Sequence, residues 1–230
     1  MRAVPLARIA RPLAALTATL LLAAAAGAAG PAGPAGPADP AADAAALARL
    51  EKGLANLDSV RAEFTQDLLA ADGSSTEHAA GTLYLRKPGR FRWDYSQPQQ
   101  LIVCDGTILW LYDPELQQAT SRRVRDTLSQ TPAMLLSGEA KVRDGFTVHD
   151  GGKGGGLDWI VLVPKADDTD FREIRLGFAG ELLRRMEFAD KLNQRTAIEL
   201  KRLERNLKLP DSLFVFVAPP GVDVIGPAAH

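Results

Sequence analysis

The residues that could carry out acid–base, nucleophilic or metal chemistry are few and widely separated in this sequence. His78, His149 and His230 are its only histidines, and they form no metal-ligand spacing. Cys104 is the only cysteine, so no disulfide can form within the chain, and its apolar neighbours indicate a buried, unreactive thiol. No serine lies in a turn of the nucleophile type. We therefore expect a protein that is not an enzyme and that needs neither a metal nor a cofactor.

Two further segments resemble ligand-binding loops but lack the residues that such loops need. The glycine-rich run 151–156 has no Lys-Ser or Lys-Thr ending, and no helix is expected after it, so a hairpin tip is predicted instead of a phosphate site. The acidic segment 167–170 lacks the pattern of a calcium loop. The formal net charge of −1 gives no reason to expect nucleic acid binding.

The apolar residues follow a more regular pattern than the polar ones. Phe91, Trp93 and Tyr95 alternate with charged residues, which predicts a strand with three aromatic rings on one face. The same alternation in neighbouring segments extends this face to the set Phe64, Leu83, Leu85, Phe91, Trp93, Tyr95, Met186 and Phe188. Two interpretations stay open: the ordinary core of a sandwich or barrel, or a lipid cavity beneath a movable helical lid.

Helical periodicity is confined to a few short segments. Residues 40–57 carry an apolar stripe that is expected to pack against another apolar surface of the protein. Asp39 and Pro40 provide a helix start. Residues 131–137 are apolar almost all round, so Met134 and Leu135 are expected to be buried or to cover a cavity. A third helical turn is expected near residue 210.

Strand-like segments joined by short turns occupy the rest of the chain from residue 60 to residue 217. No strand–helix alternation points to a parallel sheet. The predicted fold is therefore mainly β with an α-helical lid: a single antiparallel sheet of about ten to eleven strands, curled into an incomplete barrel and covered by about three short helices. Residues 117–125 are predicted as an edge strand, and residues 215–217 as the last strand.

Residues 1–28 have the organisation of a secretory signal peptide, in which a basic start precedes an apolar run and a small-residue exit. An uncleaved anchor helix is the alternative, because no charge lies between Arg11 and Asp39. Three prolines at 31, 34 and 37 favour a flexible linker over residues 29–42 instead. The folded domain is expected at 43–226, followed by a tail at 227–230.

An ordered set of short motifs resembles one known family. Its members here are Gln66; Gly81-x-Leu83; Lys87-Pro88-x-x-Phe91-x-Trp93; Gln97-Pro98; Asp105-Gly106-x-x-x-Trp110-x-Tyr112-Asp113-Pro114; Gln118-Ala119-Thr120; and Thr131-Pro132. In this order, from about residue 44 to about residue 225, the sequence resembles the outer-membrane lipoprotein carrier proteins, the LolA family. No single motif is diagnostic, but the ordered set is specific.

The resemblance implies a monomeric periplasmic chaperone whose incomplete barrel is closed by a helical lid. Such a protein takes triacylated lipoproteins from an inner-membrane Lol ABC transporter and passes them to the outer-membrane receptor LolB. The resemblance assigns Phe91 to cargo handling and places a lid latch at Lys87, where the family often has an arginine, with its lid contact near Leu136 and Ser137. Because an ammonium has fewer and less directional donors than a guanidinium, a weaker latch is implied.

Three other functions are weighed against the carrier. A membrane-anchored receptor of the same fold would need an anchoring cysteine near Ala28, and none is present. A periplasmic lipid- or lipoprotein-sensing module would use the same fold, but no obvious second domain accompanies it. A secreted hydrolase lacks a nucleophile and a metal set.

Overall fold

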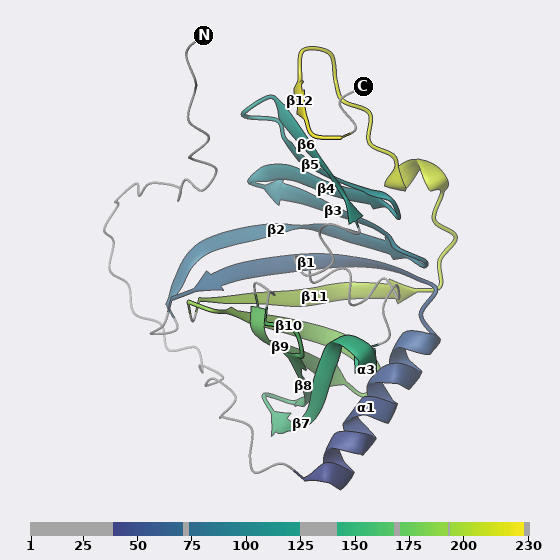
Figure 1. Ribbon diagram of the computed structural model, residues 1–230, viewed down its shortest axis with the longest axis vertical. Coiled ribbons are helices and arrows are strands. Elements are labelled where there is room, and N and C mark those ends of the chain that lie inside the picture. Colours follow the sequence, from purple (N-terminus) through teal and green to yellow (C-terminus); the bar gives the residue numbers. More distant parts are fainter. Residues whose placement is uncertain (1–38, 71–73, 125–141, 168–170, 193, 228–230) are drawn as a thin grey trace. The chain divides into compact units, whose positions relative to one another are not determined.

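The computed structural model describes residues 39–70, 74–124, 142–167, 171–192 and 194–227, and these form one twelve-stranded sheet with a few helical pieces (Figure 1). The strands are β1 Ser59–Leu69, β2 Ser75–Arg86, β3 Arg90–Gln97, β4 Gln99–Asp105, β5 Ile108–Asp113, β6 Gln118–Arg123, β7 Phe146–Gly154, β8 Leu157–Pro164, β9 Phe171–Ala179, β10 Leu182–Asp190, β11 Arg195–Arg205 and β12 Asp223–Ile225. The helical pieces are α1 Pro40–Ala55, α3 Val142–Gly145 and the 3-10 turn η2 Asp211–Phe214.

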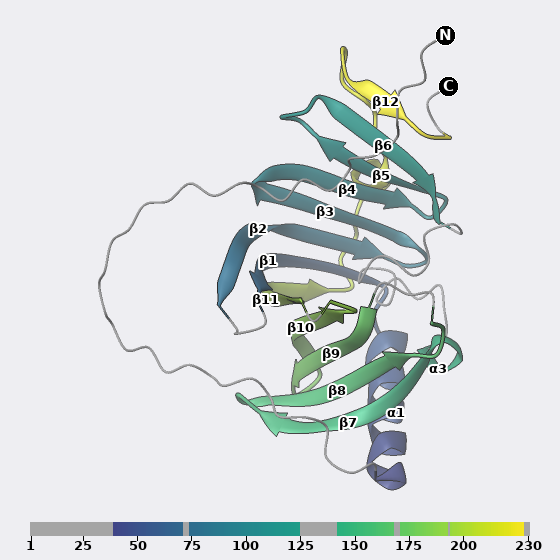
Figure 2. The same cartoon turned by 60° about the vertical axis from the view of Figure 1, so that its left-hand side comes forward.

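The sheet has the order β12-β6-β5-β4-β3-β2-β1-β11-β10-β9-β8-β7, so its two edges are β12 and β7. Strands β1 to β11 pair with one another in antiparallel fashion, and β12 pairs with β6 in parallel. Figure 2 shows that the sheet is strongly twisted and curved, with β2 bent along its length. The prediction of one curled, open, mainly antiparallel sheet is confirmed.

The strand and helix numbers differ from the prediction. Twelve strands are present instead of ten to eleven, and residues 215–217 are not a strand because Phe216 packs on the sheet, with ring centroids 5.0 Å from Trp110 and 5.4 Å from Tyr112. The last strand is β12. The described residues contain two α-helices and one 3-10 turn, and the short α3 was not predicted. The predicted helix at 131–137 falls on residues that the structure does not describe.

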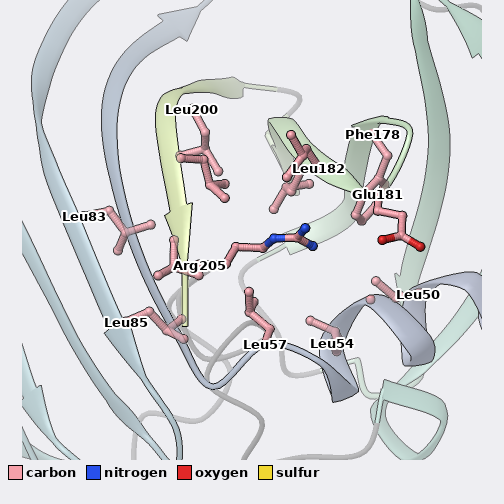
Figure 3. A pocket seen from close by; sticks show the side chains of 14 residues that line it. Leu50, Leu54, Leu57, Leu83, Leu85, Phe178, Glu181, Leu182, Leu200 and Arg205 are labelled. Atoms are coloured by element: carbon pink, nitrogen blue, oxygen red, sulfur yellow. The ribbon is translucent and has the colours of Figure 1, made fainter. Parts of the chain in front are cut away.

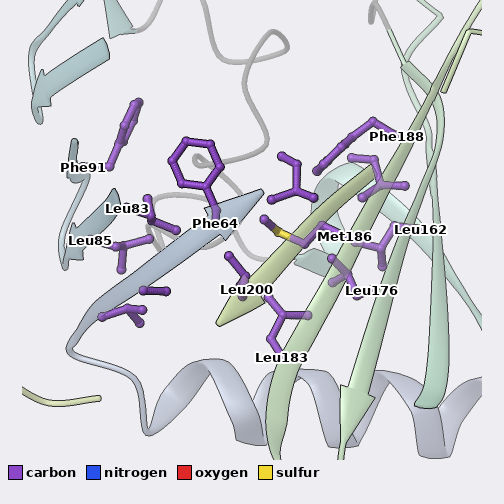
Figure 4. Packing of buried hydrophobic residues seen from close by; sticks show 14 of the residues in the cluster. Phe64, Leu83, Leu85, Phe91, Leu162, Leu176, Leu183, Met186, Phe188 and Leu200 are labelled. Atoms are coloured by element: carbon purple, nitrogen blue, oxygen red, sulfur yellow. The ribbon is translucent and has the colours of Figure 1, made fainter. Parts of the chain in front are cut away.

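One face of the sheet holds the main hydrophobic core. Strand alternation places Phe64, Leu83 and Trp93 on that inner face, where they are at most 4% exposed. The register aligns them across strands, since Leu83 pairs with Trp93 and Phe64 pairs with Leu200. Figure 4 shows Leu83 and Phe91 on one side of Phe64 of β1, and Leu200 and Met186 on the other. Cross-strand apolar pairs of this kind stabilise the sheet and fix its register.

The C-terminal segment covers part of the opposite, outer face. Phe214 of η2 is 1% exposed and lies beneath Arg86, whose guanidinium carbon is 4.9 Å from the ring centroid. Asp211 accepts hydrogen bonds from Arg86 and, at 2.7 Å, from Arg90. These arginines alternate with the inner-face residues along the chain, so the same strands hold the core on one side and the C-terminal segment on the other.

Helix α1 is capped and tied to the sheet by polar contacts. Asp39 accepts a hydrogen bond from the backbone of Ala41 at 3.0 Å, which confirms the predicted helix start. One Asp43 carboxylate oxygen accepts from the backbone N–H of Asp150 on β7 at 2.8 Å, and the other lies 2.9 Å from His149 Nδ1. Further along, Glu51 forms a two-pronged ion pair with Arg143 of α3, at 2.8 and 2.6 Å.

The pH dependence of stability should report the contact between α1 and β7. The backbone N–H of Asp150, more than the neighbouring His149, lowers the pKa of Asp43 below its ordinary value of 3.8. The native state therefore binds fewer protons at this site than the unfolded state does. The stabilisation is complete at pH values above 3.8 and is lost as the pH falls through the lowered pKa.

We expect Asp43→Ala to lower the free energy of unfolding at pH 7 by about 1 kcal/mol, because it removes a hydrogen bond to a charged acceptor. Urea unfolding at pH 7 and at pH 3 measures this loss, which should shrink at the lower pH. Asp144→Ala, which removes an acidic residue from α3 and leaves the α1 contact intact, serves as the control. A loss of equal size at both pH values would contradict the assignment.

Candidate hydrophobic cavity

An apolar cavity lies between the C-terminal half of α1 and the inner face of the sheet (Figure 3). It contains about 560 Å³ not filled by atoms, including the part that opens to solvent. Its lining consists of Leu50, Gly53, Leu54 and Leu57 from α1 and the following turn, and Val60, Leu83, Leu85, Phe178, Glu181, Leu182, Leu183, Leu200, Leu203 and Arg205 from the sheet. Glu181 and Arg205 are the two charged residues of this lining. A site with this lining suits an aliphatic ligand.

The sequence explains why α1 provides the roof of this cavity. Leu50 lies on the apolar stripe of the helix and is 1% exposed, while Leu54 and Leu57 are partly buried against the core. Gly53 lines the cavity, and apart from its chain neighbours and the backbone of its own helix no atom lies within 4 Å of the point where a Cβ on this residue would be. The helix therefore leaves empty space where a side chain would fit.

The predicted cavity residues fall into two groups. Leu83 and Leu85 line the cavity itself. Six others belong to the packed inner-face cluster or pack against it and do not line the cavity: Phe64, Phe91, Trp93, Tyr95, Met186 and Phe188. Met134 and Leu135 lie outside the described part of the chain. The roof leucines of α1 are missing from the predicted set, although the helical stripe that contains them was recognised.

Aromatic rings form a compact group on the inner face. Phe64 packs edge-on against Trp93, with ring centroids 4.7 Å apart, and against Tyr95 at 5.0 Å. Gly81 lies between Phe64 and Tyr95 in the register, and a Cβ there would lie 2.1 Å from the backbone oxygen of Asp94. Only glycine allows β2 and β3 to approach this closely, so the ring group depends on a residue with no side chain.

A second aromatic contact lies across the inner face, on the far strands of the sheet. Phe188 of β10 is 2% exposed and packs against Phe171 of β9 at a centroid distance of 5.5 Å. Met186, also on β10, is 1% exposed and pairs with Ile198 and Leu176 on the neighbouring strands. The inner face is thus mainly apolar from β3 to β9.

Lys87 holds the end of α1. Its ammonium group donates a hydrogen bond to the backbone carbonyl of Leu54, in the last turn of the helix. Burial lowers the pKa of Lys87, and the negative charge of Asp58 opposes this shift. A cation at a helix C-terminus is also favoured by the helix dipole. Leu136 and Ser137, the predicted partners of this lysine, are not among the residues that the structure describes.

The described residues contain no group of histidine, cysteine, aspartate and glutamate side chains that could hold a metal ion. Within the same part of the chain, no helix has the length and apolar character needed to cross a membrane. Two of the three histidines are described, and each lies next to an aspartate: His149 beside Asp43, and His78 beside Asp67 at 3.0 Å.

Comparisons with known proteins identify relatives of the chain. The family model described as "Outer membrane lipoprotein carrier protein LolA" matches residues 55–217. Curated outer-membrane lipoprotein carrier proteins of Dechloromonas aromatica and Methylococcus capsulatus are each 40% identical to the chain, over 179 and 178 residues, which is 77% of this chain and 86% of each relative.

A solved structure supports the fold independently. An uncharacterized conserved protein from Thermus thermophilus matches 79% of this chain and 97% of its own length, with a TM-score of 0.50 and 14% identity. At this identity the likeness concerns the fold alone. The family-model match covers β1 to β11, and together with the curated relatives it shows that the chain belongs to the outer membrane lipoprotein carrier protein LolA family.

Proposed function

We propose that this protein is a periplasmic carrier that binds the acyl chains of lipoproteins and delivers them to the outer membrane. The observation that carries the proposal is the aliphatic cavity beneath α1, in a chain whose relatives are named outer-membrane lipoprotein carrier proteins. The family is one of binding proteins, and the proposed role requires no catalytic group.

The hydrophobic effect explains why such a carrier needs a closed apolar cavity. Each methylene contributes about 0.8 kcal/mol on burial, so a long acyl chain exposed to water costs on the order of 10 kcal/mol. A carrier must bind the chain tightly enough to cross an aqueous compartment and must still release it. A helix that covers the cavity and is tied down by polar contacts meets both needs, because its movement removes part of the lining and so lowers the affinity.

The proposal also includes the cargo, the partners and the location of the protein. The cargo is a triacylated lipoprotein, received from an inner-membrane Lol ABC transporter and passed to the receptor LolB, and the carrier acts as a monomer. Residues 1–28 direct export as a cleaved signal peptide. Phe91, which is 1% exposed on the inner face, belongs to the surface that the acyl chains contact once the helix has moved.

We propose that α1 is a lid and that Lys87 is its latch. The latch residue lies 33 positions from Leu54 in sequence, and its bond holds the helix end that roofs the cavity. Asn206 of the turn after β11 supports the same end, since its side chain donates to the carbonyl of Asn56 at 3.2 Å and accepts from the backbone of Asp58 at 2.9 Å. Release of these contacts would free the C-terminal half of the lid.

Filling the cavity should abolish cargo uptake without unfolding the protein. In Gly53→Phe the ring would occupy the empty space above the sheet, and the helix would gain stability from the loss of glycine. The assay uses membrane vesicles that contain the lipoprotein transporter, a lipoprotein and ATP, and it measures lipoprotein in the soluble fraction. We expect the amount of soluble lipoprotein to fall about tenfold or more, because the ring takes the space that several methylenes of the acyl chain would fill.

Gly53→Ala is the matched control for that experiment. It changes the helix propensity in the same direction but leaves most of the cavity empty, so uptake should stay near the wild-type level. Normal uptake by Gly53→Phe would show that the cavity beneath α1 is not the cargo site. No soluble one-to-one complex with wild-type protein would contradict the carrier function itself.

Removal of the latch donor should loosen α1. Lys87→Met keeps the length and apolar stem of the side chain but cannot donate to Leu54, so amide hydrogen exchange at residues 54–57 should rise about fivefold. Lys165→Met, which removes the ammonium that donates to the Arg143 carbonyl at 2.7 Å, is the control. Unchanged exchange at residues 54–57 in Lys87→Met would exclude the latch.

The latch also predicts a dependence on alkaline pH. Because burial lowers the pKa of Lys87, the unfolded state binds more protons at this site in the interval just below pH 10.5. The wild type should therefore gain stability relative to Lys87→Met as the pH rises through this interval. Urea unfolding at pH 8 and pH 10.5 measures the free energy of unfolding of both proteins. A loss of wild-type stability relative to Lys87→Met over this interval would contradict the burial of the ammonium.

A further inference from the structure

A polar pair interrupts the apolar inner face of the sheet. Gln66 of β1 lies on the same face as Val60 and Phe64, since side chains alternate along the strand. The hydroxyl of Tyr95 on β3 donates to Gln66 Oε1 at 3.1 Å. Tyr95 reaches over β2 because the β2 positions between the two strands are Ala79 and Gly81. The fold therefore builds one hydrogen-bonded pair into a wall of aliphatic and aromatic side chains.

The pair keeps an unused donor on this face. An amide side chain has two N–H donors on Nε2, and Gln66 uses only its oxygen in the bond with Tyr95. Among the residues that the structure describes, no partner of Gln66 Nε2 is present. Burial raises the pKa of Tyr95 to about 12, so the phenol stays protonated and keeps the amide oriented at physiological pH. Gln66 is partly exposed and its Nε2 is not among the buried side-chain atoms without a partner, so this donor is accessible to the acceptor oxygen of a ligand.

The distance from the pair to the cavity matches the length of an acyl chain. Val60 lines the cavity beneath α1, and Gln66 lies six residues further along β1, or about 20 Å at about 3.3 Å per residue. Carbon–carbon bonds of about 1.52 Å meeting at about 111° advance about 1.25 Å per methylene, so this distance spans about 16 carbons. A chain whose methyl end lies beneath α1 and that runs along β1 would place its carbonyl near Gln66. This path crosses Ala62 and Phe64, which are 0% and 2% exposed, so it requires the packing over them to open.

We propose that Gln66 binds the ester carbonyl of a long acyl chain through Nε2, with Tyr95 as the residue that positions its amide. This inference rests on the proposed function and adds a polar contact to it. The apolar face binds the methylenes of the chain, and the Gln66–Tyr95 pair binds the ester group at which the methylenes end. The chemistry is that of an acyl ester, which lipoproteins share with phospholipids.

Ester and ether lipids of equal length test the proposal in the wild-type protein. A fluorescent lipopeptide whose glyceryl cysteine carries two palmitoyl esters is titrated beside its dihexadecyl ether analogue, which lacks both carbonyls. We expect the ester to bind about three- to tenfold more tightly, the effect of one hydrogen bond. Equal affinities would overturn the carbonyl site and leave the carrier function intact, whereas no binding of either lipid would contradict the carrier function too.

Variants then assign the preference to the pair. Gln66→Met keeps the side-chain length but removes both amide groups, and it should bind ester and ether equally. Ile198→Met changes the directly paired neighbour on β11 without altering polar groups and should keep the preference. An ester preference retained in Gln66→Met would overturn the assignment.

A second variant covers the case in which Gln66→Met fails to fold. Tyr95→Phe retains the ring and its packing and frees the amide to rotate, so the ester preference should fall below the wild-type value, and an unchanged preference would contradict the positioning role. A dipalmitoyl phospholipid serves as an additional arm. If it shows the same dependence on Gln66, the site recognises the ester of either source, whereas dependence for the lipopeptide alone identifies a lipoprotein as the ligand.

Discussion

An open sheet with one apolar face must keep that face from water, and the rest of the structure depends on this constraint. The sheet is not closed into a barrel, because its edges are β12 and β7. Its inner residues are almost fully buried, with Phe64 and Met186 at 2% and 1% exposure. The apolar stripe of α1 supplies part of the cover, and the space left beneath Leu50 and Leu54 is the cavity. The cavity that we propose as the cargo site is therefore a consequence of incomplete filling between one helix and the sheet.

The cover is held by the apolar packing of Ala46 and Leu50 and by polar contacts along the helix, and the polar contacts suit the movement that we propose for it. Asp43 joins the first turn to β7, Glu51 pairs with Arg143, and Lys87 binds the last turn. Each contact is worth about 1 kcal/mol, far less than the burial of an acyl chain. The burial of an acyl chain would thus outweigh these three polar contacts together. The C-terminal segment, by contrast, is anchored to the outer face by the buried Phe214 and the Asp211 ion pairs.

The inner face combines two kinds of recognition. Aliphatic and aromatic side chains favour any long hydrocarbon, because hydrophobic burial has no direction. The Gln66–Tyr95 hydrogen bond is directional and occurs at one level of the face, with only small side chains on the strand between. Such a pair can set the depth of a chain that the apolar surface alone would let slide. In the binding mode that we propose, the apolar surface selects long hydrocarbons and the hydrogen-bonded pair sets how deeply they bind.

Sequence alone determined the class of the fold and the residues of its inner face. The period-two alternation of Phe91, Trp93 and Tyr95 and the helical stripe over Leu50 and Leu54 are local patterns that burial confirmed. Only the tertiary structure decided which apolar residues line the cavity. A register shift between Leu183 and Arg185 brings Leu183 to the face of Met186, although they are three residues apart.

The contacts that close the cavity also depended on tertiary structure. Lys87 meets Leu54 because β2 ends beside the last turn of α1, and residues 215–217 lie on the sheet because Phe216 finds two rings there. The physical reason is the same in each case. Periodicity reports which side of an element is buried, whereas bulges, strand ends and helix ends set which distant groups meet, and these depend on the packing of the whole chain.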